Sequence, residues 1–457
     1  MAQKKIERLD TWPEWFTGKT INEPIFCREF LERHKLAYTE NSFFTTEGRV
    51  TNEDAMRQTI YQQLEPFIVT GMSKKVDDIM KDLRIKAQVT GLLPQTDRVH
   101  VQNGTVFLDG SFIEAKNEIV RSRFPVRFNP KVKKPERWLK FLSELFWPED
   151  IPTLQEFIGY CLIPSNAGQK MMVIKGSGGE GKSQIGHVLS RMFGPNAKDG
   201  SVGKISENPF ARADLEHIHL MIDDDMRLEA LKQTNYIKAI VTAKGKMDLE
   251  RKGKQSYQGF MYARILAFSN GDLVSLYDRS DGFFRRQLIL TTKRKPPDRI
   301  DDPNLSEKLC EEMEGIFLWA MAGLLRLVKN NFRFTESDQA RVNREAVKKD
   351  ANNVELFLES KGYITRGPDC SVSSKELGDV YHTWCEENAY PALKSKTLIE
   401  QLVANQEKYG IQYTTHLINS AGRQVRGFKG IGSLIKTSGY SSGGWQQVDP
   451  DDNPFKT

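Results

Sequence analysis

A glycine-rich segment that ends in Gly-Lys-Ser carries the clearest chemical signal in the sequence. Its residues read GSGGEGKS and match the pattern G-x-x-x-x-G-K-[ST] at every fixed position. Glycines let the backbone turn consecutive N–H groups toward an anion, the lysine reaches the β- and γ-phosphates, and the serine hydroxyl binds Mg²⁺. Glu180 is unexpected here, because its charge would face the phosphates unless the side chain points to solvent. We therefore expect ATP and Mg²⁺ to bind at Gly176, Ser177, Gly178, Gly179, Glu180, Gly181, Lys182 and Ser183.

An acidic cluster follows an apolar run in the segment HIHLMIDDDM, downstream of the glycine-rich loop. A P-loop ATPase needs a second strand that ends in acidic residues, to hold Mg²⁺ and to position the attacking water. We expect Asp223 to bind the metal, directly or through water, and Asp224 to polarise the water. Asp225 would shift this register by one residue, and the sequence leaves both registers open.

Three further features follow in chain order. The segment AKGKMDLERKGKQSYQGF contains two β-capable runs around Lys252 and Lys254, which predicts a hairpin with a cationic tip. Two cations on a short hairpin suit a sequence-independent grip on a DNA backbone, although a solvated charged turn is the alternative. The strand MYARILAFSN ends in Asn270, where a γ-phosphate sensor would lie. The pair Arg285 and Arg286 comes next and could supply an arginine finger to a neighbouring subunit's ATP, or form an ordinary surface salt bridge.

The order of these motifs resembles that of superfamily 3 DNA helicases, and most closely the phage and plasmid primase-helicase family, which includes the poxvirus primase-helicase. The resemblance extends over roughly residues 130–434. It implies an AAA+-like motor that forms a hexameric ring, moves 3′ to 5′ on single-stranded DNA and lines its pore with Lys252 and Lys254. It also implies catalytic roles for Lys182, Asp223, Asp224 and Asn270, and a finger role for Arg285 or Arg286.

The elements that position these residues follow from the apolar pattern. Short β-type runs alternate with helical segments between Met171 and about Leu290, which predicts an α/β fold with a mostly parallel sheet and helices on both faces. Upstream, RVHVQNGTVFLDGSF predicts a β-hairpin around Asn103-Gly104, and the helical spacing from Trp138 to Tyr160 is broken by prolines. We expect an N-terminal α+β domain (1–130), a helical linker or collar (131–170), the ATPase domain (171–350), a winged-helix domain (351–435) and a disordered tail (436–457).

The winged-helix expectation rests on three helical patterns followed by a basic, glycine-rich hairpin. The segment KSKTLIEQLVANQEKYG would be the recognition helix that enters the major groove of double-stranded DNA, with a wing along the phosphates. A winged helix used only for packing or protein contact stays open. The candidate DNA-binding residues of this part are Lys394, Lys396, Arg423, Arg426 and Lys429.

Composition narrows the class of protein. The 457 residues carry a net charge of +6, which fits a polyanionic partner but is weak evidence by itself. The five cysteines show neither the spacing of a zinc site nor that of a disulfide framework. No signal peptide is evident, and the longest apolar run, Ile316–Leu325, is too short to cross a membrane, so we expect a soluble cytoplasmic protein, in the host cytoplasm if it is viral. The first 130 residues contain no persuasive pair of metal-binding carboxylates, so a primase or polymerase would be a separate partner.

The leading interpretation is therefore an ATP-dependent DNA helicase that replicates a phage, plasmid or mobile element. One alternative is a replication initiator that binds an origin through residues 353–434 and melts it. Another is a P-loop switch ATPase that assembles without unwinding DNA. A metabolic kinase is the weakest alternative, because the cationic hairpin and the arginine pair would have no task in it.

Overall fold

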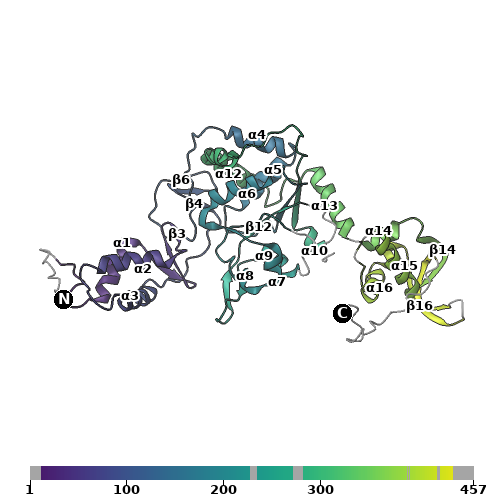
Figure 1. Ribbon diagram of the computed structural model, residues 1–457, viewed down its shortest axis with the longest axis horizontal. Helices are drawn as coiled ribbons and strands as arrows, with labels where there is room; N and C mark the ends of the chain where they lie inside the picture. The colour runs from purple at the N-terminus through teal and green to yellow at the C-terminus, as the bar shows by residue number, and fades with distance from the viewer. Residues whose placement is uncertain are drawn as a thin grey trace, which may run out of the picture. The chain divides into compact units, whose positions relative to one another are not determined.

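The structure is a computed structural model that describes residues 12–226, 234–270, 281–351, 353–388, 390, 392–418 and 422–435. The chain divides into two compact units, Met1–Glu345 and Ala346–Thr457 (Figure 1). The expected disordered tail lies outside the described residues. In the part of the chain that is described, no helix is long and apolar enough to cross a membrane.

The first unit begins with a small α+β domain, as expected. Asn22 and Asn52 cap two of its helices, each accepting a hydrogen bond from a backbone N–H of the first turn. Apolar residues of all three helices, including Phe30, Ile60 and Leu83, share a core with Phe43 of the sheet. The elements are α1 (Glu23–His34), β1 (Ala37–Thr39), β2 (Ser42–Thr45), β3 (Gly48–Arg49), α2 (Glu53–Leu64) and α3 (Met72–Lys86).

The next sheet contains the hairpin expected around Asn103-Gly104. Its position shows where the N-terminal hydrophobic core ends and the central core begins. Strands β4 (Arg98–Val101), β5 (Gly104–Phe107) and β6 (Phe112–Ile113) form an antiparallel sheet in that order. Val99, Val101 and Val106 belong to the same buried cluster as the central parallel sheet rather than to the N-terminal core. The hydrophobic cores therefore divide before residue 98, earlier than the domain boundary expected at residue 130.

A five-stranded parallel sheet forms the centre of the first unit, which confirms the expected α/β arrangement. Its order is β13-β7-β12-β9-β8, and all four pairings are parallel. Met172 and Ile174 of β7 face the core shared with α6, and their neighbours Met171 and Val173 are buried as well, as expected for a sheet covered on both faces. The strands are β7 (Met171–Lys175), β8 (Ala197–Asp199), β9 (Leu220–Asp223), β12 (Arg264–Ser269) and β13 (Gln287–Thr291).

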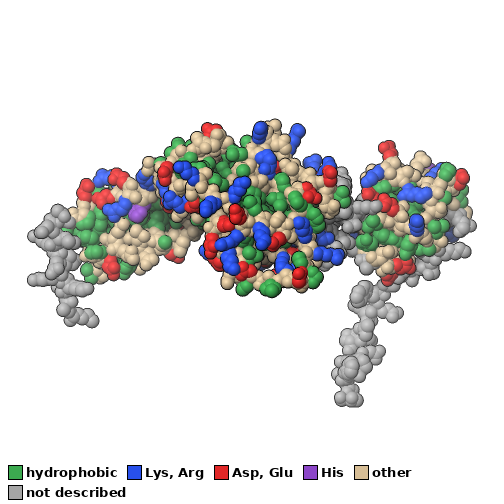
Figure 2. Space-filling view, turned by 90° about the horizontal axis from the view of Figure 1, so that it is seen from above, with side chains coloured by type: hydrophobic (Ala, Val, Ile, Leu, Met, Phe, Trp, Pro, Cys, Tyr) green, Lys and Arg blue, Asp and Glu red, His purple; other side chains and the backbone are tan. Residues whose placement is uncertain are grey.

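Helices cover both faces of this sheet (Figure 1). Collar helices α4 (Glu136–Leu145) and α5 (Ile151–Tyr160) lie with α6 (Lys182–Phe193) and α12 (Met313–Lys329) on one side of β12. Helices α7 (Val202–Glu207), α8 (Pro209–Ala213) and α9 (Asn235–Thr242) lie on the other. The remaining helices of this unit are η1 (Gly194–Asn196), α10 (Asp281–Phe284) and α11 (Leu305–Cys310). On the face drawn in Figure 2, Lys and Arg side chains are interspersed with Asp and Glu, so the positive charge is not gathered there in one patch.

The cationic hairpin is a separate two-stranded sheet. It consists of β10 (Lys246–Leu249) and β11 (Tyr257–Phe260), paired antiparallel. Lys252 and Lys254 lie in the connecting turn, and Gly253 between them has a φ of +74°, a conformation that favours glycine. The hairpin expected from the sequence is confirmed.

The second unit follows α13 (Asp338–Ala351), a helix that runs across the division between the units. Its three strands form one antiparallel sheet in the order β14-β16-β15, packed on the helices through Phe357, Tyr381 and Phe428. Helices precede and follow the first strand, and the last two strands form the long hairpin. The elements are α14 (Asn353–Glu359), β14 (Ile364–Ser373), α15 (Ser374–Glu387), α16 (Ser395–Ala404), α17 (Gln406–Tyr409), β15 (Gln412–Ile418) and β16 (Gln424–Ser433).

Two glycines set the close packing of α5 against α12, and this generates a prediction. A Cβ on Gly323 would lie 2.4 Å from the Gln155 carbonyl oxygen, and a Cβ on Gly159 would lie 2.3 Å from that of Ala320. Gly323→Ala should therefore destabilise the first unit by about 1–3 kcal/mol, because the helices must separate. Urea unfolding followed by circular dichroism measures this. Gly203→Ala is the control, since its Cβ would meet only Ser201 Oγ at 3.5 Å. Equal stability of the two variants would contradict the packing argument.

Candidate nucleotide-binding site

The glycine-rich loop connects the end of β7 to the start of α6. Gly178, Gly179 and Gly181 have φ values of +104°, +78° and +105°, so the loop uses backbone conformations that other residues rarely adopt. A Cβ on Gly176 would lie 2.5 Å from Lys182 Nζ, so a side chain at this position would displace the loop lysine from where it lies. The loop therefore has the strand–turn–helix setting that the sequence motif requires.

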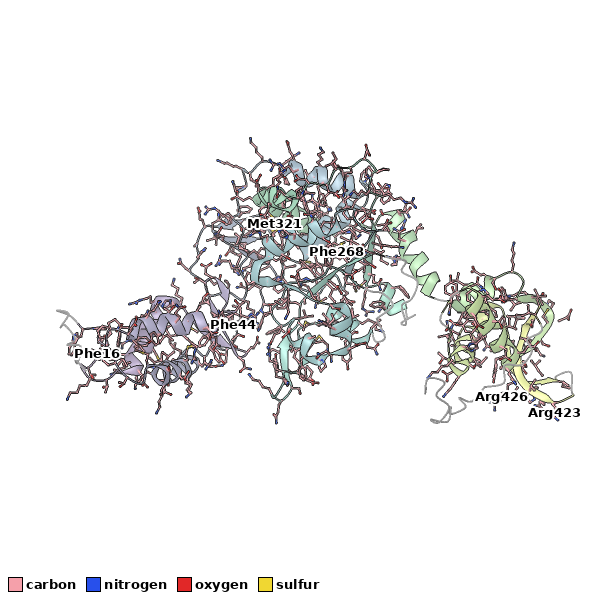
Figure 3. The ribbon with its side chains drawn as sticks, viewed as in Figure 1. Phe16, Phe44, Phe268, Met321, Arg423 and Arg426 are labelled. Atoms are coloured by element: carbon pink, nitrogen blue, oxygen red, sulfur yellow. The ribbon has the colours of Figure 1, made fainter. Side chains whose placement is uncertain are left out.

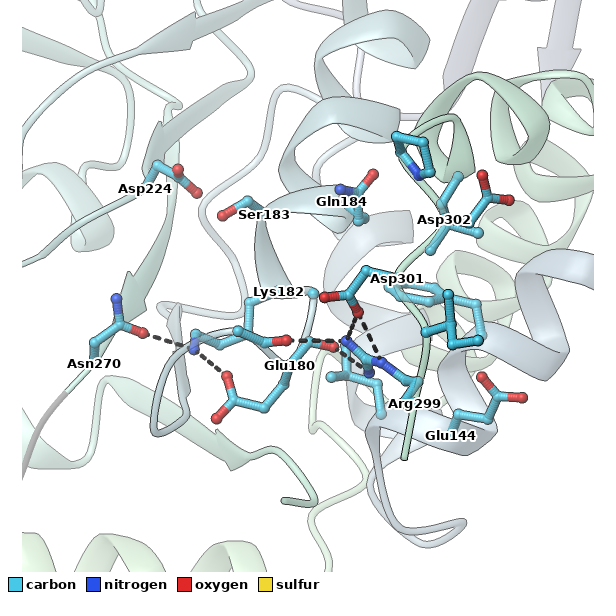
Figure 4. A pocket seen from close by; sticks show the side chains of 17 residues that line it. Glu144, Glu180, Lys182, Ser183, Gln184, Asp224, Asn270, Arg299, Asp301 and Asp302 are labelled. Atoms are coloured by element: carbon cyan, nitrogen blue, oxygen red, sulfur yellow. Dashed lines mark hydrogen bonds and ion pairs between the residues drawn. The ribbon is translucent and has the colours of Figure 1, made fainter. Parts of the chain in front are cut away.

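A cavity of about 550 Å³ opens beside this loop. This volume lies within the range of small-molecule sites. Among the residues expected from the sequence, the cavity brings together Lys182, Ser183, Asp224 and Asn270 with the second half of the loop (Figure 4). It is also lined by residues that the sequence did not single out: Phe141, Glu144, Leu145, Gln184, Arg299, Ile300, Asp301, Asp302, Pro303 and Leu305.

Lys182 is buried at the base of the cavity between two oxygen acceptors. Its Nζ lies 2.8 Å from Asn270 Oδ1 and 2.9 Å from Glu180 Oε2. Asn270 reaches this position because β12 pairs in parallel with β7. Ser269 lies opposite Lys175, so the residues that follow both strands meet at the carboxyl ends of the sheet. The structure thus places Asn270 beside the loop lysine, and its role as a γ-phosphate sensor stays a prediction.

The three consecutive aspartates differ in their surroundings. Asp223 ends β9 and is buried, and its carboxylate accepts hydrogen bonds from Val202 N–H (2.7 Å) and Asp225 N–H (3.4 Å). Burial raises the pKa of Asp223 despite these hydrogen bonds. Asp224 is exposed and lines the cavity, whereas the described lining includes neither Asp223 nor Asp225. The metal role expected for Asp223 stays a prediction. Of the three consecutive aspartates, Asp224 is the one that lines the cavity beside the loop.

The arginine pair lies at the amino ends of the parallel strands, opposite the ends that carry the glycine-rich loop. Arg285 and Arg286 directly precede β13, and the Arg286 carbonyl accepts a hydrogen bond from Met171 N–H at the start of β7 (2.8 Å). The glycine-rich loop begins at the opposite end of β7. This strand has five residues, so its two ends lie about 15 Å apart. Neither arginine therefore lines the cavity of its own chain. Burial and the charge of Arg285 lower the pKa of Arg286.

Arg299 is a cavity residue that sequence reasoning missed. Its guanidinium donates hydrogen bonds to the carbonyl oxygens of Gly179 and Glu180, both at 2.9 Å, and pairs with Asp301. Hydrogen bonds from Lys295 and Arg299 lower the pKa of Asp301. Arg299 thus ties the loop backbone to the segment after β13. Only the charged composition of KRKPPDRIDD hinted at this segment, and nothing in its spacing connected it to the loop.

A buried ion-pair network anchors the base of the cationic hairpin. Glu216 accepts hydrogen bonds from Arg251 Nη2 (3.0 Å) and Tyr257 Oη (2.7 Å). Glu216, Glu40 and His217 approach one another closely enough to hold a metal ion, but Arg121 pairs with Glu40 at 2.9 Å. Burial and the nearby arginine charges hold the pKa of His217 well below its usual value. The cluster is better described as a network that fixes the hairpin, because cations already balance its carboxylates.

The cationic candidates of the second unit lie on two elements. Lys394 precedes α16 and Lys396 lies in its first turn, 3.9 Å from Glu400. Arg426 and Lys429 are exposed on β16, and Arg423 is exposed just before it. Figure 3 shows Arg423 and Arg426 along this strand. The tip between β15 and β16, residues 419–421, lies outside the described residues.

Comparisons with known proteins support the fold and leave the activity open. Residues 174–286 match the model of a family of unknown function, DUF5906. A structure titled "The A form apo structure of NrS-1 C terminal region-CTR(305-718)" is similar to this chain, with a TM-score of 0.50 and 10% identity, covering 89% of this chain and 99% of that one. A second, "The apo structure of NrS-1 C terminal region (305-718)", has a TM-score of 0.47 and 10% identity, covering 90% and 100%. A search of curated proteins finds no match to this chain.

The contacts of Arg299 lead to a prediction about loop order. Arg299→Ala removes two charged hydrogen bonds to the loop carbonyls, so amide exchange at Ser177 and Gly178 should accelerate about tenfold. Hydrogen exchange measured by mass spectrometry tests this. Arg294→Ala, an exposed cation in the same segment, should leave loop exchange unchanged. Unchanged exchange in Arg299→Ala would remove Arg299 from this role.

Proposed function

We propose that this protein is an ATP-dependent DNA helicase that acts in the replication of a phage, plasmid or mobile element. The observation that carries the proposal is the convergence of Lys182, Ser183, Asp224 and Asn270 on one cavity, from three elements of the parallel sheet. The motif order supports the helicase class, because it resembles that of superfamily 3 helicases. The likeness to the NrS-1 C-terminal region supports the fold alone.

The cavity residues fit a nucleoside triphosphate with Mg²⁺. The Ser183 hydroxyl and the Asp224 carboxylate supply the oxygen donors that Mg²⁺ prefers, and both line the cavity. Mg²⁺ would neutralise charge on the β- and γ-phosphates. Lys182 and Asn270 would then bind and orient the γ-phosphate, and Asp224 would orient the attacking water. Asp223, if it contacts the metal as the family resemblance implies, would do so while anchored to Val202.

An apolar wall of the cavity suits the base of the nucleotide. Phe141, Leu145 and Leu305 supply this wall, and a Cβ on Gly181 would lie 3.7 Å from the Phe141 ring, so the wall adjoins the loop. An apolar wall with a few polar groups is typical of sites that hold a planar ring. We place the base against this wall and the phosphates along the loop.

The remote position of the arginine pair favours a ring. The two arginines lie at the amino ends of the strands, and their own loop lies at the carboxyl ends. They could therefore complete only the ATP site of a neighbouring subunit. A homo-oligomer, hexameric by the family resemblance, would bring one of them to each ATP.

DNA would contact two separate sets of cations. Lys252 and Lys254 at the tip of a rigidly anchored hairpin would bind the backbone of single-stranded DNA. In the second unit, helix α16 followed by the β15–β16 hairpin supports the proposal of a winged helix. Its cations, Lys394, Lys396, Arg423, Arg426 and Lys429, would bind double-stranded DNA. These cations also favour the second candidate function, an origin-binding initiator, which would require a sequence preference in the second unit.

Hydrolysis of ATP tests the active site. Lys182→Ala should lose ATP binding and hydrolysis, and Asn270→Ala should keep binding within about threefold while kcat falls about 10²-fold, because Asn270 is proposed to act on the γ-phosphate during reaction. ATPase assays with and without single-stranded DNA, together with nucleotide titrations, measure both. Full activity of Lys182→Ala would rule out this site.

The cationic hairpin is tested by its effect on DNA stimulation. Lys252→Ala/Lys254→Ala should abolish stimulation by single-stranded DNA and leave basal hydrolysis within about twofold, because only backbone contacts are lost. Lys74→Ala/Lys81→Ala on α3 is the control with the same change in charge. If hydrolysis ignores DNA and the hairpin change has no effect, a non-unwinding switch ATPase becomes the better account.

A further inference from the structure

Glu180 points into the glycine-rich loop rather than to solvent. Its side chain is 3% exposed, and its carboxylate accepts three hydrogen bonds. Oε1 accepts from the backbone N–H of Ser177, and Oε2 accepts from Gly178 N–H at 3.1 Å and from Lys182 Nζ at 2.9 Å. From the sequence, the Glu180 charge is expected to face the phosphates unless the side chain points to solvent. In the structure the side chain does not point to solvent.

These three donors are of the kind that a phosphate loop offers to its ligand. Backbone N–H groups of such a loop surround the phosphates, and its lysine contacts the β- and γ-phosphates. A carboxylate is a compact anion with two acceptor oxygens, so it satisfies the same donors. A donor that is bonded to Glu180 cannot at the same time give its full hydrogen bond to a phosphate.

The surroundings hold the backbone of Glu180 in place and leave only the side chain to move. Arg299 binds the carbonyl oxygens of Gly179 and Glu180. Gly176 leaves space for the inward carboxylate, since a Cβ there would lie 2.7 Å from Glu180 Oε2. Burial raises the pKa of Glu180, but the hydrogen bonds from Lys182 and the loop N–H groups outweigh this and lower it, so the carboxyl is ionised at neutral pH.

We propose that Glu180 is an internal competitor at the nucleotide site, whose carboxylate competes with the ligand's phosphates for Ser177 N–H, Gly178 N–H and Lys182 Nζ and sets how tightly phosphate ligands bind. Binding then requires the Glu180 side chain to rotate out of the loop. The cost of this rotation is the same for every ligand that needs these donors, so it weakens the binding of each by the same factor. A ligand with few other contacts then binds too weakly to occupy the site, whereas a nucleoside triphosphate still binds through its further phosphate and base contacts. This inference rests on the proposed function of the loop.

The test compares Glu180→Gln and Glu180→Ala with the unmodified full-length chain. Isothermal titration gives Kd values for ATP and for pyrophosphate, each with Mg²⁺. Both variants should bind ATP and pyrophosphate about tenfold more tightly, by similar factors, because both ligands need the same donors. Glu144→Gln is the control. It removes the same charge from the cavity rim without touching the loop, and its Kd values should stay within about twofold.

The outcomes separate this inference from the proposed function. Tighter binding by the Glu180 variants supports it, including the case in which only these variants bind. If the unmodified chain binds ATP and both variants bind it equally or more weakly, Glu180 does not compete and the inference is overturned, while the nucleotide site stands. If Glu144→Gln gains as much as Glu180→Gln, general charge explains the effect and the inference also fails. If no variant binds ATP or pyrophosphate, both the inference and the proposed function fail.

Discussion

The parallel pairing of β7 between β12 and β13 is the constraint on which the rest of the site depends. It sets Lys175 beside Ser269 and Thr291, so segments separated by about a hundred residues leave the sheet at one edge. The glycine-rich loop and Asn270 meet there because parallel strands present all their carboxyl ends together. The same pairing sends the arginine pair to the opposite edge. One pairing pattern thus separates the groups proposed to act on the chain's own nucleotide from Arg285 and Arg286 at the other end of the strands.

Buried polar contacts tie the neighbouring elements to this sheet. Arg264, at the start of β12, is almost fully buried and donates hydrogen bonds to the carbonyls of Cys161 and Ser165 at the end of the collar. Glu216 anchors the cationic hairpin beside the start of β9. Such groups are costly to bury unless they are paired, so each fixes its element in one position.

Electrostatics inside the loop oppose the simplest view of a phosphate site. A loop that concentrates N–H donors and a buried lysine attracts any anion within reach, and the chain supplies one in Glu180. Because Glu180 already accepts hydrogen bonds from these donors, the loop is stabilised without a ligand. A ligand must therefore make contacts strong enough to replace the Glu180 carboxylate. Arg299 completes the arrangement from the other side by holding the loop carbonyls. Under the proposal made above, these contacts link nucleotide affinity to rotation of the Glu180 side chain rather than to refolding of the backbone.

Local patterns in the sequence determined the glycine-rich loop, the parallel α/β sheet, the cationic hairpin and the turn at Asn103-Gly104, because each depends on residues close together in the chain. The tertiary structure alone decided four other matters. It turned Glu180 inward, made Asp224 rather than Asp223 face the cavity, and brought Arg299 and Phe141 to the loop. It also drew the strands after residue 98 into the central core. These outcomes depend on contacts between residues far apart in sequence, and local spacing carries no information about such contacts.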